Sequence, residues 1–206
     1  MAIIATYQTP KGNIAVADLH LLSDEILQSV ELSHEEQFIL GSYTHEFRKR
    51  QWLAVRYLTS LFEKGASISY SESGKPYLTN SEKHISVSHS GDLIALYISN
   101  SPCGIDIEKT GHKVQKIAPK FMNDEEILSA SDSNIAEIFL IYWVCKEAAY
   151  KVEGSKGVSL RNNIFVHHIA SDQSNETAAD ILIHGHKTTI KIHFERFREY
   201  MIAWTI

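Results

Sequence analysis

The sequence predicts an α+β fold built from two similar halves, each with a sheet packed on one long helix. Three observations predict it. Residues 44–64 and 135–151 have apolar side chains at helical spacing. Short β-rich runs bounded by turn residues lie around these two helices. The Ser101-Pro102 break falls between the helices, so we expect an N-terminal half of residues 1–102 and a C-terminal half of residues 103–206.

In the first half, strands and short helices are expected before the long helix, and a hairpin after it. Ser33 followed by Glu36 has the spacing of a capping box and predicts a helix start. Gly74-Lys75-Pro76 predicts a turn. The expected elements are strands at 3–7 and 14–17, helices at 24–29, 33–40 and 44–64, and hairpin strands at 85–88 and 93–98.

The second half is expected to begin with a strand, continue with helices and end in antiparallel strands. Its expected elements are a strand at 104–108, helices at 116–121, 124–128 and 135–151, and strands at 164–168, 179–183, 188–194 and 199–205, with loops at 171–176 and at Gly185.

Composition excludes several classes of protein. The 206 residues are 44% hydrophobic and 22% charged, which is typical of a globular chain rather than a disordered one. The longest apolar run is too short to span a bilayer, and the N-terminus has no secretory pattern. Cys103 and Cys145 form no spaced Cys/His pattern, so we expect neither zinc nor disulfides, and a cytoplasmic protein. A net charge of -5 gives no reason to expect nucleic acid as a partner.

Two carboxylates are predicted to lie side by side on the strand at 104–108. Because side chains alternate along a strand, Asp106 and Glu108 share one face. A solvated acidic edge has the same pattern, so the pair alone does not define a site.

The second long helix can supply a third carboxylate. Trp143, Glu147 and Lys151 are four residues apart and form one stripe. Glu147 and Lys151 are also compatible with a simple surface ion pair. If Glu147 meets the strand acids, each close pair of anions repels by about 4 kcal/mol at intermediate dielectric, so a hard cation such as Mg2+ is expected among them.

A third candidate element is residues 84–91, where a strand carrying Ser88 and His89 runs into a turn with Gly91. Hydroxyls and an imidazole at a strand end can hold a phosphate. An ordinary hydrogen-bonded hairpin turn fits the same residues. A serine hydrolase is disfavoured because the segment lacks the G-x-S-x-G pattern.

Taken in order, four segments resemble the Sfp-type 4'-phosphopantetheinyl transferases: Gly74-Lys75-Pro76, Ser86-Val87-Ser88-His89-Ser90-Gly91, Gly104-Ile105-Asp106-Ile107-Glu108, and Trp143-x-x-Lys146-Glu147-Ala148-x-x-Lys151. The resemblance implies a pseudo-twofold monomer of two similar α+β halves, with coenzyme A in the cleft between them.

The resemblance also implies roles for individual residues. Asp106, Glu108 and Glu147 would bind Mg2+, for which Mn2+ could substitute. Glu147 and Lys151 would be catalytic, with Lys151 also contacting the phosphates. The residues expected to hold coenzyme A are Arg50, Lys75, Ser88, His89 and Lys151.

The implied reaction moves the phosphopantetheine arm of coenzyme A onto a serine of an apo acyl or peptidyl carrier protein, releasing adenosine 3',5'-bisphosphate. The acidic carrier could dock on a basic segment, with apolar Phe121 and Met122 beside it if they are exposed; a solvated helix face is the alternative. Its basic residues are Lys109, Lys113, Lys116 and Lys120. A Mg2+-dependent hydrolase or nucleotidyl transferase, and a module that binds coenzyme A without acting on it, are the competing hypotheses.

Overall fold

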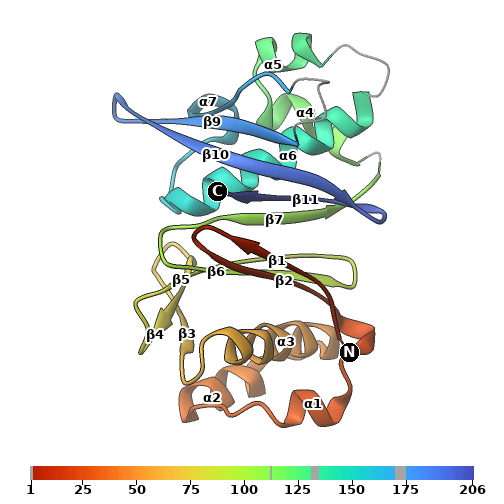
Figure 1. Ribbon diagram of the computed structural model, residues 1–206, viewed down its shortest axis with the longest axis vertical. Helices are drawn as coiled ribbons and strands as arrows, with labels where there is room; N and C mark the ends of the chain where they lie inside the picture. Colours follow the sequence, from red (N-terminus) through yellow and green to blue (C-terminus); the bar gives the residue numbers. More distant parts are fainter. Residues whose placement is uncertain (1, 112, 131–134, 170–174) are drawn as a thin grey trace. The chain divides into compact units, whose positions relative to one another are not determined.

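The computed structural model describes residues 2–111, 113–130, 135–169 and 175–206. The chain folds into two compact units, Met1–Pro102 and Cys103–Ile206 (Figure 1). Each unit combines an antiparallel sheet with one long helix, so the predicted α+β class is confirmed. The two units are described separately below.

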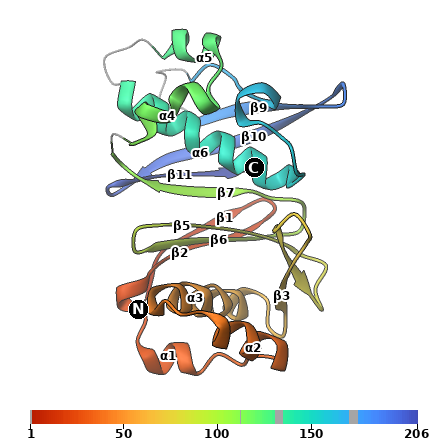
Figure 2. The same cartoon turned by 180° about the vertical axis from the view of Figure 1, so that it is seen from behind.

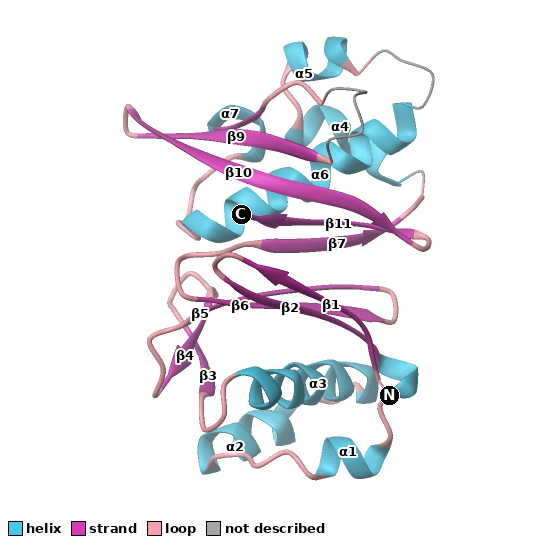
Figure 3. Cartoon of the chain, viewed as in Figure 1, coloured by secondary structure: helices cyan, strands magenta, loops and turns pink. Residues whose placement is uncertain are grey.

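The sheet of the first unit has the strand order β1-β2-β6-β5, and all its neighbours are antiparallel. Its strands are β1 (Ile3–Thr9), β2 (Gly12–Asp18), β5 (His84–Ser90) and β6 (Leu93–Ser99). Helix α3 (Glu46–Phe62) lies along one face of this sheet (Figure 3). Ala54 and Leu58 of α3 are fully buried against Ile94 and Leu96 of β6, because the apolar stripe of the helix faces the strands.

Three short helical segments and a small hairpin complete this unit: η1 (Leu19–Leu21), α1 (Asp24–Gln28), α2 (His34–Ser42), β3 (Ser67–Tyr70) and β4 (Pro76–Thr79). The predicted capping box of α2 is confirmed, with Ser33 Oγ accepting from Glu36 N and Glu36 Oε2 accepting from Ser33 N, both at 3.2 Å. The β3–β4 hairpin around the predicted turn was not expected, because its strands have only four residues and β3 is half serine.

The second unit has a five-stranded antiparallel sheet in the order β7-β11-β10-β9-β8, with α6 (Ile135–Glu153) along one face (Figure 2). Its strands are β7 (Ile105–Lys109), β8 (Ile164–Val166), β9 (Glu176–Ile183), β10 (His186–Phe197) and β11 (Tyr200–Thr205). The core between helix and sheet includes Val144 and Ala148 from α6 with Ile192 and Ala203 from the strands.

Helices α4 (Lys113–Phe121), α5 (Asp124–Ser129) and α7 (Leu160–Asn163) flank α6. The expected strand at 164–168 ends at Val166, and the His167 side chain just beyond it lies 3.0 Å from Asp180. β9 begins at Glu176, inside the loop expected at 171–176, of which residues 171–174 lie outside the described residues. The single turn of α7 was not predicted, since four residues show no helical period.

Each unit contains a buried ion pair between its long helix and the short helix before it. In the first unit, Arg56 Nε donates to Glu36 Oε1 at 2.8 Å. In the second, Lys146 Nζ lies 2.8 Å from Glu126 Oε2, and Lys146 is wholly buried. Each glutamate is the N3 residue of a capping box.

No helix among the described residues is long and apolar enough to cross a membrane. Cys103 and Cys145 are both buried, and no disulfide joins them.

Candidate active site

Strand β7 presents its two acids to the face of the sheet that α6 covers. Asp106 and Glu108 stand opposite Ala203 and Met201 of β11, which belong to the core beneath α6. Because cross-strand partners share a face, the predicted side-by-side placement of the two acids is confirmed. Asp106 is 6% exposed, so its carboxylate is largely removed from water.

Helix α6 approaches the start of β7 very closely at Gly104. A Cβ built on Gly104 would lie 1.9 Å from the carbonyl oxygen of Ala148, closer than any side chain allows. Gly104 is also fixed by Thr205, whose Oγ1 accepts from Gly104 N at 3.0 Å. This contact between backbones sets how near the helix comes to the acids of the strand.

Lys151, near the end of α6, binds directly to β7. Its Nζ donates to Asp106 Oδ1 at 2.7 Å and to the carbonyl oxygen of Ile105 at 2.8 Å. The Asp106 side chain is 8% exposed and that of Lys151 is 23% exposed, so the pair is mostly shielded from water. The ammonium therefore offsets the charge of a carboxylate that has little solvent around it.

Glu147 lies one helical turn before Lys151, within electrostatic reach of both strand acids. The pKa of Glu147 is raised to about 7, chiefly by burial and next by the charge of Asp106; Lys151 acts to lower it and Glu108 adds to the rise. A carboxyl group with this pKa can accept or release a proton near neutral pH. The three acids and Lys151 thus form one electrostatic cluster.

Among the described residues, no three His, Cys, Asp or Glu side chains are arranged as a ready set of metal ligands. The chemistry of the cluster nevertheless fits a divalent cation. The charges of Asp106 and Glu108 disfavour ionisation of Glu147, and a bound cation would relieve this repulsion between carboxylates. Asp106 already binds one cation, the ammonium of Lys151. Oxygen ligands without sulfur or imidazole fit Mg2+.

The other motif residues of α6 hold the helix in place. Lys146 Nζ donates to the carbonyl oxygens of Leu160 at 2.8 Å and Ile164 at 2.6 Å, in addition to its pair with Glu126. Trp143 packs edge-on against Phe121, with ring centroids 5.0 Å apart. Lys146 is therefore a structural residue next to a candidate catalytic one, a division that the motif does not reveal.

In the first unit, Ser88 and His89 project to opposite faces of β5. His89 stands opposite Ile94, on the face that α3 covers, while Ser88 is buried opposite Ala95. Arg48 of α3 brings its Nη1 to 3.4 Å from His89 Nε2. Sequence reasoning missed Arg48, although its helical position next to other basic residues was visible.

His89 and Arg48 line a pocket of about 380 Å³. Among its described lining residues none is acidic, and aromatic and apolar side chains form much of its wall: Tyr43, Trp52, Val55, Tyr70, Pro76 and Val87. Trp52 Nε1 is buried and finds no hydrogen-bond acceptor within the described chain. A cation, an imidazole and a spare N–H donor beside aromatic rings suit an anionic ligand with a planar ring.

Arg50 and Lys75 lie outside this pocket's lining. The guanidinium of Arg50 pairs with Asp24 and donates to the carbonyl oxygens of Leu19 at 3.1 Å and Leu22 at 2.5 Å. Lys75 is in the turn between β3 and β4, directly before Pro76 of the pocket wall. Arg50 is thus bound by residues of its own unit. Lys75 is adjacent in sequence to Pro76, which lines the pocket.

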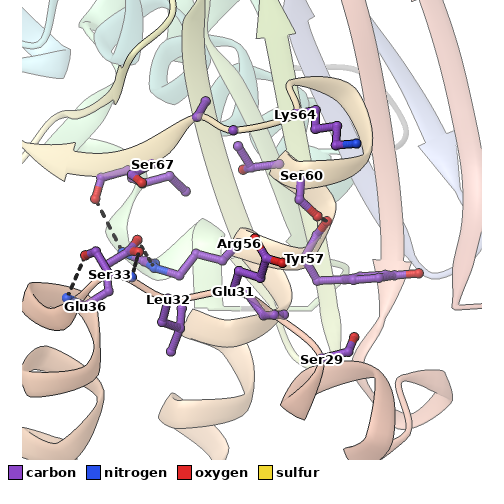
Figure 4. Close-up of a pocket in the computed structure, with 15 residues that line it drawn as sticks. Ser29, Glu31, Leu32, Ser33, Glu36, Arg56, Tyr57, Ser60, Lys64 and Ser67 are labelled. Atoms are coloured by element: carbon purple, nitrogen blue, oxygen red, sulfur yellow. Dashed lines mark hydrogen bonds and ion pairs between the residues drawn. The ribbon is translucent and has the colours of Figure 1, made fainter.

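A second pocket of the first unit, about 560 Å³, lies between the approach to α2, the C-terminal half of α3 and the connection to β3 (Figure 4). Arg56 and Glu36 pair within it, and Lys64 and Glu31 also line it. None of the coenzyme A residues predicted from the sequence lines this pocket.

The basic segment predicted as a docking surface is only partly available. Lys116 and Lys120 are exposed, but Lys109 pairs with Glu199 at 3.3 Å, and the side chain of Lys113 is outside the described part of the chain. Phe121 and Met122 are 1% and 0% exposed, so the condition under which they would support docking of a carrier is not met. They belong to the core beneath α6, where α4 packs.

Comparison with known proteins identifies relatives of this chain. The sequence model of the 4'-phosphopantetheinyl transferase superfamily matches residues 102–205. The 4'-phosphopantetheinyl transferase gsp of Aneurinibacillus migulanus is 35% identical over 98 residues, which are 46% of this chain and 40% of that protein. Sfp of Bacillus subtilis (strain 168) is 35% identical over 96 residues, covering 45% and 42%.

A third relative, 4'-phosphopantetheinyl transferase psf-1 of Bacillus pumilus, is 32% identical over 103 residues, covering 48% of this chain and 44% of that protein. The chain therefore matches less than half of the length of each of these relatives. The family match includes β7 and α6, which carry Asp106, Glu108, Glu147 and Lys151.

Proposed function

Because the chain belongs to the 4'-phosphopantetheinyl transferase superfamily, we propose that it transfers the 4'-phosphopantetheine group of coenzyme A to a serine of an apo carrier protein. The observation that supports this most directly is the cluster of Asp106, Glu147 and Lys151 on the two elements, β7 and α6, that the family match includes. The proposed enzyme is a Mg2+-dependent cytoplasmic monomer.

Asp106, Glu108 and Glu147 would hold the divalent cation, which when bound supplies positive charge to the phosphates of coenzyme A. Lys151 adds a second positive charge at the same place and orients the pyrophosphate. These two positive charges would then neutralise the charge that develops on the phosphoryl oxygens.

In the transfer step, the serine oxygen of the carrier bonds to the β-phosphorus, and the bond from that phosphorus to the bridging oxygen breaks. The bond pair leaves with adenosine 3',5'-bisphosphate, and the serine proton goes to Glu147. Before the cation binds, burial and the nearby acids raise the pKa of Glu147 to about 7, so its carboxylate is intrinsically a stronger base than an exposed one.

We assign the nucleotide end of coenzyme A to the pocket of His89 and Arg48. The guanidinium and imidazole would bind the 3'-phosphate, and the tyrosines would pack against the adenine. Lys75 and Ser88 remain predicted contacts of coenzyme A, and so does Arg50.

The test of the activity is the mass of an apo carrier protein after incubation with the enzyme, coenzyme A and Mg2+. We expect a gain equal to one phosphopantetheine group, lost when coenzyme A is omitted. Hydrolysis of coenzyme A without a change in the carrier would contradict the proposal and favour a hydrolase; binding of coenzyme A with neither reaction would favour a binding module.

The two arginines can be separated by a matched pair of variants. Arg48→Gln should raise the KM for coenzyme A by about tenfold, the effect of one lost charge-assisted hydrogen bond, and should affect dephospho-coenzyme A less. Arg50→Gln should raise that KM by less, because its guanidinium is already engaged by Asp24, and should also lower stability, because it releases the carbonyl oxygens of Leu19 and Leu22. An unchanged KM in Arg48→Gln would remove Arg48 from the nucleotide site.

A further inference from the structure

We propose that Lys151 is an internal competitor of the divalent cation for Asp106, so that binding of the cation releases the Lys151 ammonium toward the substrate phosphates. The inference rests on the proposed function for the identity of the cation. The inference gives the Lys151 ammonium two positions, one on Asp106 before the cation binds and one on the substrate phosphates afterwards.

The contact that carries the inference is direct. Lys151 Nζ occupies Asp106 Oδ1 at 2.7 Å and is held from the other side by the Ile105 carbonyl oxygen at 2.8 Å. Two acceptors on adjacent residues of β7 thus fix one ammonium group. Because an Asp carboxylate has two oxygens and Lys151 takes one of them, an ion on Asp106 would share the carboxylate with an ammonium.

The same oxygen cannot serve both cations well. Mg2+ binds carboxylate oxygens at about 2.0–2.1 Å, so an ion on Asp106 would bring its two positive charges next to the ammonium. The Asp106 side chain is 8% exposed, and little solvent is present there to screen that repulsion. This repulsion favours movement of the ammonium when the ion enters, whichever of the two carboxylate oxygens the ion takes.

Lys151 has a route for this movement. Its side chain is 23% exposed and comes from the last turns of α6, so the flexible stem can turn toward solvent without disturbing the helix. In its present position it also offsets the mutual repulsion of Asp106, Glu108 and Glu147. One lysine would then stabilise the acids before the ion binds and contact phosphate afterwards.

The first test uses Mn2+ binding, followed by the electron paramagnetic resonance signal of free Mn2+, without coenzyme A or carrier. Lys151→Met keeps the length of the side chain and removes its charge; we expect Mn2+ to bind about tenfold more tightly. Lys151→Arg retains the charge and should bind Mn2+ no more tightly than the unaltered protein.

The control is Lys156→Met, which removes one positive charge just beyond α6 from an exposed side chain that makes no ion pair with the described residues. It should change Mn2+ affinity by less than about twofold, since an exposed charge is screened. Equal affinities in Lys151→Met and the unaltered protein, or equal gains in Lys151→Met and Lys156→Met, would overturn the inference.

A second measurement needs no variant. The unaltered protein is treated briefly with an amine-acylating reagent at increasing Mg2+, and labelled peptides are quantified by mass spectrometry. Labelling of Lys151 should rise with Mg2+ while that of Lys156 stays constant; no rise for Lys151 at saturating Mg2+ would contradict its release. Neither measurement involves transfer, so a failed transfer assay and a failed competition remain distinguishable.

Discussion

The two units share a structural plan but differ in the chemistry at its centre. In each, a buried cation on the long helix pairs with the capping-box glutamate of the preceding short helix, and the partners are twenty residues apart in both. The residue after the cation is Tyr57 in the first unit and Glu147 in the second. At this position the shared scaffold carries a carboxylate in the second unit and a tyrosine in the first. This difference indicates that the buried ion pair stabilises the fold, whereas we assign a function to the acids.

The largest effect is expected from breaking the shared feature. Arg56→Met and Lys146→Met each leave a buried carboxylate without its cation, so each should lower the free energy of unfolding by about 3–5 kcal/mol. Urea unfolding followed by circular dichroism measures both. Similar losses of stability would support equivalent roles for the two ion pairs. A negligible loss in either variant would show that the two pairs are not equivalent.

Double variants test the same comparison of the two ion pairs more closely. Glu36→Leu with Arg56→Met should recover part of the lost stability, because the unpaired charge is removed together with its partner. Glu126→Leu with Lys146→Met should recover less, since Glu126 accepts from the backbone N–H of Val166 in addition to the capping-box bond that both glutamates make.

The next effect concerns the position at which the units differ. Glu147→Gln should lower the transfer rate by about 10²- to 10⁴-fold, since the amide can neither accept the serine proton nor ligate a cation as an anion. The matched change in the first unit, Tyr57→Phe, should leave the rate within about twofold. Comparable losses in both would refute the assignment of the chemistry to the second unit alone.

A smaller effect is expected in the pH dependence of stability. In the folded protein the pKa of Glu147 is raised to about 7 from 4.5, so the folded state holds the proton more tightly than the unfolded state. Glu147 therefore makes stability fall as pH rises from about 4.5 to about 7, by on the order of 2 kcal/mol given its partial exposure. Unfolding midpoints of Glu147→Gln, measured in chelator across this range, should lack that fall; parallel curves would contradict the shift.

The smallest effect concerns the β9–β10 hairpin of the second unit. Partial burial acts to raise the pKa of Asp180, but hydrogen bonds from Lys187, Thr189 and His167 hold it at about 2. The resulting stability is complete above pH 4 and is lost as pH falls toward 2. Asp180→Asn should thus cost about 1 kcal/mol at pH 7 and nothing near pH 2, measured by urea unfolding at the two pH values.

Much of this fold could be predicted because its long elements repeat a clear period. Helices α3 and α6 and the hairpin of β5 and β6 follow from apolar spacing alone. The β3–β4 hairpin and α7 have only four residues per strand or helix, which is too short to show a period. Contacts with residues distant in sequence stabilise them, and a local pattern does not reveal such contacts. The alternation of β7 was enough to predict that Asp106 and Glu108 share a face.

The sites could be predicted less completely, because partners distant in sequence decide what each side chain does. Arg48 and Arg50 are two positions apart on α3, so they point in different directions, and only the folded chain brings Arg48 to His89 and Arg50 to Asp24. Lys146 and Lys151 are both lysines of one motif. Burial against Glu126 makes the first structural, and Asp106 makes the second part of the acid cluster.

The contact of Gly104 with the Ala148 carbonyl has a consequence for how such a site can diversify. The separation between α6 and β7 is set by main chain against main chain, so no smaller residue exists at Gly104 to bring them closer, and any larger one must push them apart. Exchange of side chains cannot adjust that spacing in small steps. Changes in the chemistry of the acid cluster during divergence would instead have to come from replacing Asp106, Glu108 or Glu147 themselves, with the spacing between helix and strand unchanged.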